Sequence, residues 1–166
     1  MILDNRTRLI TAFLFLFLSS NSFALSTDKD QPVAIEADSV DIDEATETAI
    51  YRGNVLLTQG SIKLSAARVV VHHFQSDNAR IVATGKPVKF SQKPDDGNQL
   101  VIGKAQKTEY GLNSARLMLT GKASLVKGVN TFKNDRIIYD REKAVVKAGT
   151  SAEGKERVKI TIGRKK

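Results

Sequence analysis

The chain of 166 residues contains no cysteine. This absence excludes nucleophilic catalysis by a thiol, metal sites built from thiolates, and disulfide bonds. Small exported proteins often depend on disulfides for their stability. If this chain is exported, its apolar core and its backbone hydrogen bonds must hold the fold together unaided.

The sequence also lacks an apolar run of the roughly 20 residues that a membrane-spanning helix needs. The run Leu9 to Leu18 is too short, and it follows Arg6 and Arg8 and precedes polar residues. This order is typical of a cleaved secretory signal peptide, and small residues at positions 22 and 24 predict cleavage after Ala24. An uncleaved membrane anchor is the alternative, and the shortness of the run disfavours it.

Cleavage would remove residues 1–24 and leave 142 of the 166 residues. We expect residues 25–163 to form one domain, because this length suffices for a single core, and residues 164–166 to form a short basic tail. The exported chain would carry 24 Lys and Arg against 17 Asp and Glu, a formal charge of +7. This balance favours an anionic partner.

No long stretch shows the i, i+3, i+4, i+7 spacing of an amphipathic helix. Apolar and polar residues instead alternate with period two after residue 30. In the segment 61–66, for example, Ile62, Leu64 and Ala66 share one face. Such alternation is typical of strands with one buried face, so the sequence predicts an all-β protein.

Clusters of Gly, Asn and Asp, which accommodate the positive φ values of tight turns, interrupt the alternation at short intervals. They lie at Arg52-Gly53, Gln59-Gly60, Ser76–Asn78, Thr84-Gly85, Pro94–Gly97, Gly111, Lys127-Gly128 and Gly149. We predict that each cluster separates two short strands. Regular spacing of this kind indicates a sandwich, a barrel or a stacked roll.

Two types of strand recur along the chain. The first type opens with a small residue, at Ala37, Ala66, Ala105 and Asn134, and the second enters a glycine, at Gly53, Gly85 and Gly121. One such unit cannot bury its apolar face alone, so successive copies must stack into two facing sheets. The facing surfaces either fill a closed core or splay into a groove for acyl chains, and the pattern leaves both possibilities open.

Motifs for metal binding and catalysis are weak or missing. His72 and His73 are adjacent on an expected strand and would point to opposite faces, so they cannot easily chelate one ion. The acidic residues 36–44 lack the spacing of a calcium-binding loop. No serine stands in a G-x-S-x-G elbow, and no G-x-x-x-x-G-K-[ST] loop is present. We expect no metal, no cofactor and no catalytic residue.

Five segments share a pattern with a known family. They are QPVAIEADSVDID at Gln31–Asp43, YRGNVLLTQGSIKLSAARVVV at Tyr51–Val71, GKPVKF at Gly85–Phe90, LTGKASL at Leu119–Leu125 and DRIIYD at Asp135–Asp140. In these segments the chain resembles the OstA-like family of periplasmic lipopolysaccharide-transport proteins. The resemblance extends over nearly all of the chain after the expected signal peptide.

This resemblance implies about sixteen consecutive antiparallel strands in a twisted, V-shaped β-jellyroll that is open at both ends. It implies a periplasmic protein, not an enzyme, that binds lipopolysaccharide with the acyl chains between its sheets. Head-to-tail association with itself and with related domains would bridge the inner and outer membranes. The implied partners are membrane-anchored LptC at the N-terminal edge and outer-membrane LptD at the C-terminal edge, with no nucleic acid.

The expected lipid-binding residues are aliphatic or aromatic and face inward. The resemblance contributes Val33, Ile35, Phe90, Tyr110 and Leu112, and the apolar alternation adds Val55, Leu57, Ile62, Leu64, Leu117 and Leu119. The expected pairing edges are the first and last strands, whose backbone groups lack a neighbour in an open roll. Their residues are Val33, Ala34 and Ile35 at one end, and Val158, Ile160 and Ile162 at the other.

Two other functions compete with this interpretation. An exported enzyme acting on an acidic glycan would also suit the basic charge, but enzymes on stacked-strand scaffolds are usually much longer. A monomeric lipid carrier with a closed pocket should protect its edge strands. Here the edges carry little that would block pairing apart from Pro32 and Lys159. Unprotected edges favour the bridging protein.

Overall fold

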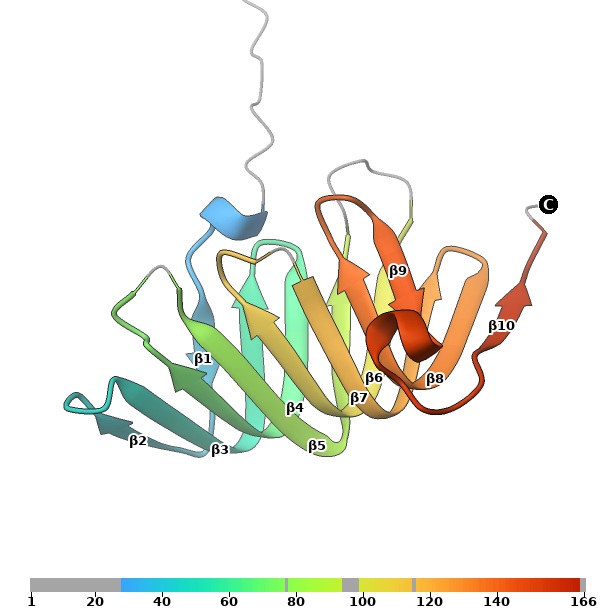
Figure 1. Cartoon of the computed structure of the whole chain (residues 1–166). Helices are drawn as coiled ribbons and strands as arrows, with labels where there is room; N and C mark the ends of the chain where they lie inside the picture. The colour runs from blue at the N-terminus through green and yellow to red at the C-terminus, as the bar shows by residue number, and fades with distance from the viewer. Residues whose placement is uncertain (1–27, 77, 94–98, 115, 165–166) are drawn as a thin grey trace, which may run out of the picture.

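The computed structural model describes residues 28–76, 78–93, 99–114 and 116–164 (Figure 1). The expected signal peptide lies outside these ranges, as do the last two residues of the basic tail. The strands are β1 (Ala34–Glu36), β2 (Ser39–Asp43), β3 (Thr48–Gln59), β4 (Ile62–His72), β5 (Arg80–Gln92), β6 (Val101–Gly111), β7 (Arg116–Lys127), β8 (Asn130–Asp140), β9 (Val145–Ala148) and β10 (Lys159–Ile162). Two short 3-10 helices, η2 (Asp28–Asp30) and η3 (Gly149–Ala152), complete the described elements. The predicted all-β class is confirmed.

All ten strands belong to one antiparallel sheet. The strands β3 to β8 follow one another in both chain order and spatial order, while β1 and β2 both pair with β3, and β9 and β10 both pair with β8. The sheet therefore starts with two short strands at one end and finishes with two at the other. Figure 1 shows β1 and β2 on the left and β9 and β10 on the right.

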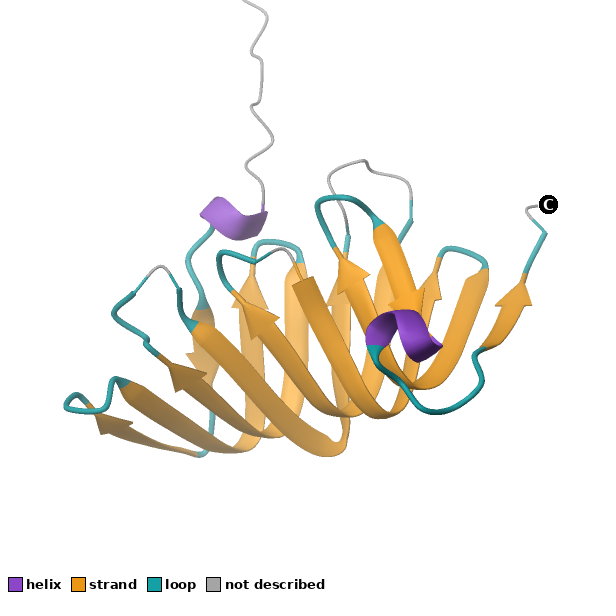
Figure 2. Cartoon of the chain, viewed as in Figure 1, coloured by secondary structure: helices purple, strands orange, loops and turns teal. Residues whose placement is uncertain are grey.

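Each of the six long strands has a break in register near its middle. The breaks lie between Arg52 and Val55 in β3, Ser65 and Arg68 in β4, Thr84 and Val88 in β5, Lys104 and Lys107 in β6, and Thr120 and Ala123 in β7. In β8, the break lies at residues 134–136, which are opposite the break in β7. At these points the strands fold over, so that the sheet has two facing arms (Figure 2).

The first arm contains β2, β9 and the halves of the long strands that lie between them. The second arm contains β1, β10 and the other halves. Counting both halves of the six long strands together with the four short strands gives sixteen, so the expected number describes half-strands. Among the residues that the structure describes, the continuous strands number ten.

The recurring glycines mark these bends. Gly53 and Asn54 have φ values of 77° and 44°, and Gly121 and Lys122 have nearly the same pair, 79° and 48°. Two consecutive positive φ values turn a strand without ending its pairing. The prediction that Arg52-Gly53 and Thr84-Gly85 separate strands was therefore wrong, because these residues lie inside β3 and β5.

The small residues of the other strand type lie at the bends of the alternate strands. Ala66 and Ala105 are the last paired residues before the breaks in β4 and β6, and Asn134 has the same place in β8. The prediction that these three residues open strands was wrong, because they lie inside β4, β6 and β8, whereas Ala37 does lie just before β2.

The hydrophobic core lies between the two arms and is formed by alternate residues of every long strand. On the side opposite the bends, the strands of both arms end in their hairpin turns, most of which lie towards the top of Figure 1, with the turn between β2 and β3 at the lower left. We call this side the mouth. No helix in the described part of the chain is long and apolar enough to cross a membrane.

Candidate functional site

All eleven residues expected to bind lipid belong to one hydrophobic cluster. Eight of them are at most 3% exposed: Val55, Leu57, Ile62, Leu64, Phe90, Tyr110, Leu117 and Leu119. The other three, Val33, Ile35 and Leu112, are partly buried and pack against the same cluster. In this structure the arms are closed upon one another, so these residues form a filled core that extends along the whole sheet.

Cross-strand pairing explains why these side chains meet. Directly opposite residues in an antiparallel sheet project from the same face. Leu57 lies opposite Leu64, and Leu64 lies opposite Phe90, which gives one continuous apolar row across three strands. Ile35 extends this row to the N-terminal end, because its partner is Leu57. The alternation in sequence therefore identified the inner face correctly.

A polar layer closes the mouth above the core. Gln59 in the second arm and Tyr110 in the first are each at most 3% exposed, and the Tyr110 hydroxyl donates a hydrogen bond to Gln59 Oε1 at 2.9 Å. Arg141, in the turn after β8, donates from Nη2 to the same hydroxyl at 2.8 Å, and its guanidinium lies 4.6 Å from the ring centroid. Burial raises the pKa of Tyr110, and the Arg141 charge and hydrogen bond oppose that shift.

A second contact crosses the mouth towards the C-terminal end. Lys127, at the end of β7 in the second arm, donates from Nζ to the carbonyl oxygen of Ala144 at 2.8 Å. Ala144 belongs to the turn between β8 and β9 in the first arm. The same ammonium lies 5.9 Å from the centroid of the Tyr139 ring. The Lys127–Ala144 and Tyr110–Gln59 hydrogen bonds thus tie the arms together, and a basic residue lies beside each of the two tyrosine rings.

Helix η2 adds a carboxylate to this layer. Asp28 is only 7% exposed, and it accepts hydrogen bonds from the backbone N–H of Ser61 at 2.6 Å, from the Ser61 hydroxyl at 2.8 Å and from Gln92 Nε2 at 2.8 Å. This layer was not predicted from the sequence. Its signal was present, because Gln59 and Gln92 continue the inward-facing series of β3 and β5 with polar side chains.

Both ends of the sheet have strands without an outer neighbour in the described part of the chain. At the C-terminal end, Val158, Ile160 and Ile162 are 36%, 53% and 79% exposed. Ile160 lies opposite Phe132, which packs against the core, so its side chain is on the inner face. At the N-terminal end Ala34 is exposed, as expected for a pairing edge.

The N-terminal end has a second edge, β2, that was not predicted from the sequence. In β2, Val40 is 48% exposed and Ile42 is 58% exposed. Their partners are Tyr51 and the buried Ala49, so both side chains project from the inner face. The apolar interior is therefore uncovered at both ends of the sheet.

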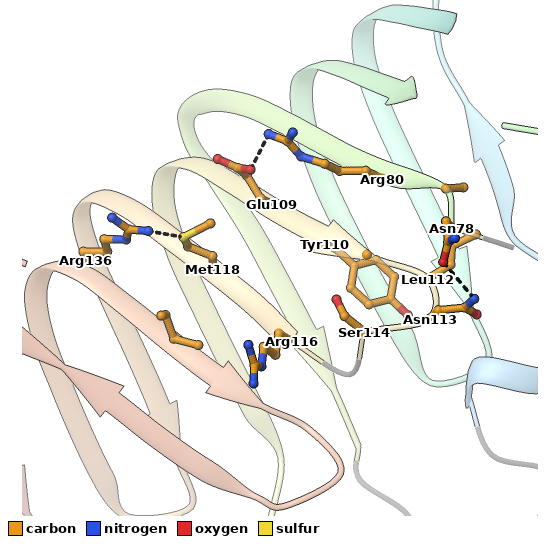
Figure 3. A pocket seen from close by; sticks show the side chains of 13 residues that line it. Asn78, Arg80, Glu109, Tyr110, Leu112, Asn113, Ser114, Arg116, Met118 and Arg136 are labelled. Carbon is orange, nitrogen blue, oxygen red and sulfur yellow. Dashed lines mark hydrogen bonds and ion pairs between the residues drawn. The ribbon is translucent and has the colours of Figure 1, made fainter. Parts of the chain in front are cut away.

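A groove of about 470 Å³ lies on the first arm and reaches its loops (Figure 3). Within it, Glu109 is paired with Arg80 at 2.6 Å, and with Lys107 at 2.7 Å. Burial raises the pKa of Glu109, but the hydrogen bonds from Lys107 and Arg80 and the charges of both outweigh it, and the net pKa is lowered. Arg136 lies beside Met118 Sδ at 3.0 Å. The contacts of Arg80 with Glu109 and of Arg136 with Met118 join neighbouring strands on the outer face, and the contact of Lys107 with Glu109 lies within β6.

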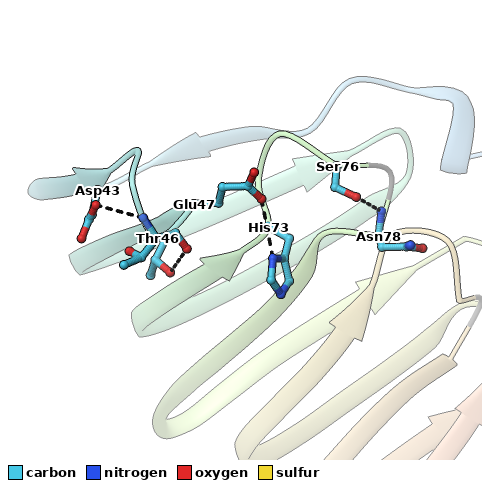
Figure 4. A network of polar contacts seen from close by, with 7 residues as sticks. Asp43, Thr46, Glu47, His73, Ser76 and Asn78 are labelled. Carbon is cyan, nitrogen blue, oxygen red and sulfur yellow. Dashed lines mark hydrogen bonds and ion pairs between the residues drawn. The ribbon is translucent and has the colours of Figure 1, made fainter.

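The two histidines and the acidic residues do not assemble a metal site. No group of three potential ligands occurs among the residues that the structure describes. His73 Nδ1 lies 3.6 Å from Glu47, and the Asp43 carboxylate accepts hydrogen bonds from the N–H groups of Ala45 and Thr46 (Figure 4). The hydrogen bond from Thr46 lowers the pKa of Asp43. These residues stabilise turns.

The fold and its uncovered ends define a class of protein: an open antiparallel roll with an apolar interior that reaches two unpaired edges. Residues 34–145 match the family model described as "LptA/(LptD N-terminal domain) LPS transport protein". The chain belongs to this family, which confirms the resemblance seen in the sequence.

Individual relatives agree with the family. The lipopolysaccharide export system protein LptH of Pseudomonas aeruginosa is 33% identical over 132 residues, which cover 79% of this chain and 75% of the relative. LptA of Escherichia coli K12 is 36% identical over 133 residues, with coverages of 79% and 71%. LptA of Haemophilus influenzae is 36% identical over 147 residues, with coverages of 87% and 84%.

A solved structure has the same architecture. The crystal structure of Pseudomonas aeruginosa LptH, described as the LptA-homologous periplasmic component of the lipopolysaccharide transport device, superposes with a TM-score of 0.76 at 28% identity. The match covers 84% of this chain and all of that one. These relatives are named as transport and export components, and their names indicate no enzymatic activity.

Proposed function

We propose that this chain is a periplasmic subunit that binds lipopolysaccharide and passes it along a bridge between the inner and outer membranes. The observation that carries the proposal is an unbroken apolar inner face that is uncovered at two unpaired ends. The names of the relatives support lipopolysaccharide as the cargo. Export through cleavage after Ala24 would deliver the chain to the periplasm.

Acyl chains would occupy the space between the arms, against the eleven residues of the inner face. The arms close by apolar contacts, and an inserted acyl chain would replace these contacts with others of the same kind. Since both states keep the side chains away from water, the net cost of exchange is small compared with unfolding. The same core can therefore be closed without cargo and splayed with it.

Pairing would occur at the two ends by strand addition. The strands β1 and β2 would receive the membrane-anchored partner LptC, and β9 and β10 would pair with outer-membrane LptD or with the N-terminal end of another copy. Because the two ends differ, these contacts are heterologous and can extend in one direction. Each added domain would cover Ile42 at one end or Ile160 and Ile162 at the other, continuing the apolar interior.

Lysine substitutions at the C-terminal end test this assembly. A double variant with Ile160→Lys and Ile162→Lys places two charges on the inner face at the C-terminal end, where the next domain would pack. We expect end-to-end association, measured by sedimentation at increasing concentration, to be lost while the monomer stays folded, because both side chains are exposed. Val145→Lys is the matched control, since Val145 is exposed on β9 and lies opposite Asp140 on the outer face.

The outcome separates the bridge from the alternatives. Association that is lost in the double variant and kept in the control supports pairing along the inner face. A wild-type chain that stays monomeric, alone and with its partner domains, would contradict the bridge and favour a lipid carrier. A glycan-cleaving enzyme has less support, because the relatives are named as export components.

A further inference from the structure

The polar layer at the mouth contains two cationic side chains, Arg141 and Lys127, that have more hydrogen-bond donors than the hydrogen bonds described for them. Arg141 gives one hydrogen bond, to the Tyr110 hydroxyl, and its Nε is buried with no hydrogen-bond partner in the described chain. Lys127 donates to one backbone carbonyl, although an ammonium has three donors. A buried donor without an acceptor is costly, so an acceptor supplied by a ligand would stabilise it.

The two cations lie along one row of the sheet. Tyr110 and Tyr139 are both paired with Leu117, from its two sides, so their rings lie two strand spacings apart, on the order of 10 Å. Arg141 lies over the first ring and Lys127 over the second. The cations are therefore placed side by side above the apolar inner face, one from each arm.

We infer that Arg141 and Lys127 form a phosphate-binding site at the mouth, in which the phosphates of a lipid replace Tyr110 and Ala144 as acceptors. This inference rests on the proposed function and names the part of the cargo that the site recognises. Arginine binds phosphate oxygens through two parallel N–H groups, and lysine binds them as a point charge. Acyl chains would extend from the bound phosphates into the core beneath.

Ligand binding then opens the mouth. The bond from Lys127 to Ala144 and the bond from Tyr110 to Gln59 cross between the arms, so a chain that enters must separate both pairs. When the arms part, the phosphate oxygens would accept the hydrogen bonds that Arg141 and Lys127 no longer donate to Tyr110 and Ala144. The Asp28 carboxylate, which accepts hydrogen bonds from Ser61 and Gln92, is a negative charge within this layer and would disfavour a second anion. Asp28→Asn is therefore expected to tighten phosphate binding.

The test compares two lipids that differ only in phosphate. Diphosphoryl lipid A and the same lipid with both phosphates removed are titrated against the chain from residue 25 onwards, in detergent micelles. We expect the wild type to bind the diphosphoryl form at least tenfold more tightly. Arg141→Gln and Lys127→Gln should each weaken binding of the diphosphoryl form by about tenfold and leave binding of the other lipid unchanged. Arg141→Lys should recover part of the loss.

Matched controls are available near the bends, away from the mouth. Arg68 and Lys89 are exposed, and Arg68→Gln and Lys89→Gln make the same changes of charge. Equal effects of the control and mouth substitutions would overturn the site, as would equal binding of the two lipids by the wild type, while the proposed function would stand. A wild type that binds neither lipid would overturn both. Thermal melting of each variant verifies that a loss of binding is not a loss of fold.

Discussion

Tyr110 has two roles that depend on different parts of its side chain. Its ring is part of the apolar cluster, and its hydroxyl joins Gln59 of one arm to Arg141 of the other. A buried hydroxyl that lacks partners costs more than an apolar group of the same shape. The ring therefore suits a core that acyl chains can enter, and the hydroxyl suits a layer that separates the core from water.

Removing this hydroxyl should weaken the closed state. We expect Tyr110→Phe to lower the free energy of unfolding by about 1–3 kcal/mol, because Gln59 and Arg141 lose a buried partner. Urea unfolding measures the change. Tyr51→Phe is the control, since Tyr51 is partly buried on the same face and its hydroxyl has no hydrogen bond in the described chain. Equal losses in the two variants would contradict a specific role for the Tyr110 hydroxyl.

The carboxylate of Glu109 should make stability depend on pH. Its pKa is lowered in the folded chain by Lys107 and Arg80 despite the opposing effect of burial, so the ion pairs contribute stability above the ordinary carboxyl pKa of 4.5. That contribution is lost as the pH falls through the lower folded pKa, because the Glu109 carboxylate is then protonated and its ion pairs are broken. As the pH is lowered below about 4.5, we expect the urea concentration at the midpoint of unfolding to decrease. The decrease should be less steep in Glu109→Gln.

A carboxylate without ion pairs provides the comparison for Glu109. Glu142 is exposed in the turn after β8 and has no ion pair in the described chain. Glu142→Gln should follow the wild-type pH profile. If Glu109→Gln lost stability on acidification as steeply as the wild type, another group would be responsible.

The residues of the inner face could be predicted from the sequence because they follow a local rule. Alternation with period two assigns Val55 and Leu57 to one face whatever lies opposite. The mouth layer follows no such rule. It joins Asp28 to Gln92 and Gln59 to Tyr110, residues 64 and 51 positions apart, and the second of these side-chain contacts depends on how the arms close.

At the scale of the strand, the bend is the feature that shapes the fold. Glycine followed by a second residue with positive φ lets β3 and β7 contribute to both arms without ending. The sequence showed the spacing of these glycines but not their role, because a glycine in a bend and a glycine in a hairpin turn have the same local pattern. Only the pairing partners on both sides distinguish a bent strand from two strands.

Gly121→Ala tests the bend directly. An alanine Cβ would lie 2.4 Å from Gln106 Oε1, and the φ of 79° is unfavourable for an L-residue by roughly 1–2 kcal/mol. We expect the free energy of unfolding, measured in urea, to decrease by at least this amount. Adding Gln106→Ala removes the clashing oxygen, so the double variant should recover the steric part and keep the φ part. Full recovery would show that φ is not strained at this position.

At the scale of the whole molecule, charge and hydrophobicity are separated. Apolar side chains are between the arms and at the ends, and basic residues of the chain, whose formal net charge is +8, are at the mouth and on the outer faces. A lipid with phosphates and acyl chains matches both surfaces.

Raising the salt concentration should weaken the part of lipid binding that comes from the exposed charges, which are screened within ~10 Å at 0.1 M, and leave the acyl contribution unchanged. Titration at two salt concentrations measures this, and affinity unchanged by salt would contradict phosphate contacts.

The central claim is that the space between the arms receives lipid. Photocrosslinking in cells that make lipopolysaccharide tests it most directly, with the probe placed in turn at Phe90, at Tyr110 and at Lys63. The first two face the core, and Lys63 is exposed between two inward-facing residues of β4. The account predicts lipopolysaccharide adducts at Phe90 and Tyr110 and none at Lys63. No adduct at any of the three positions would contradict it, because these residues would then be an ordinary closed core.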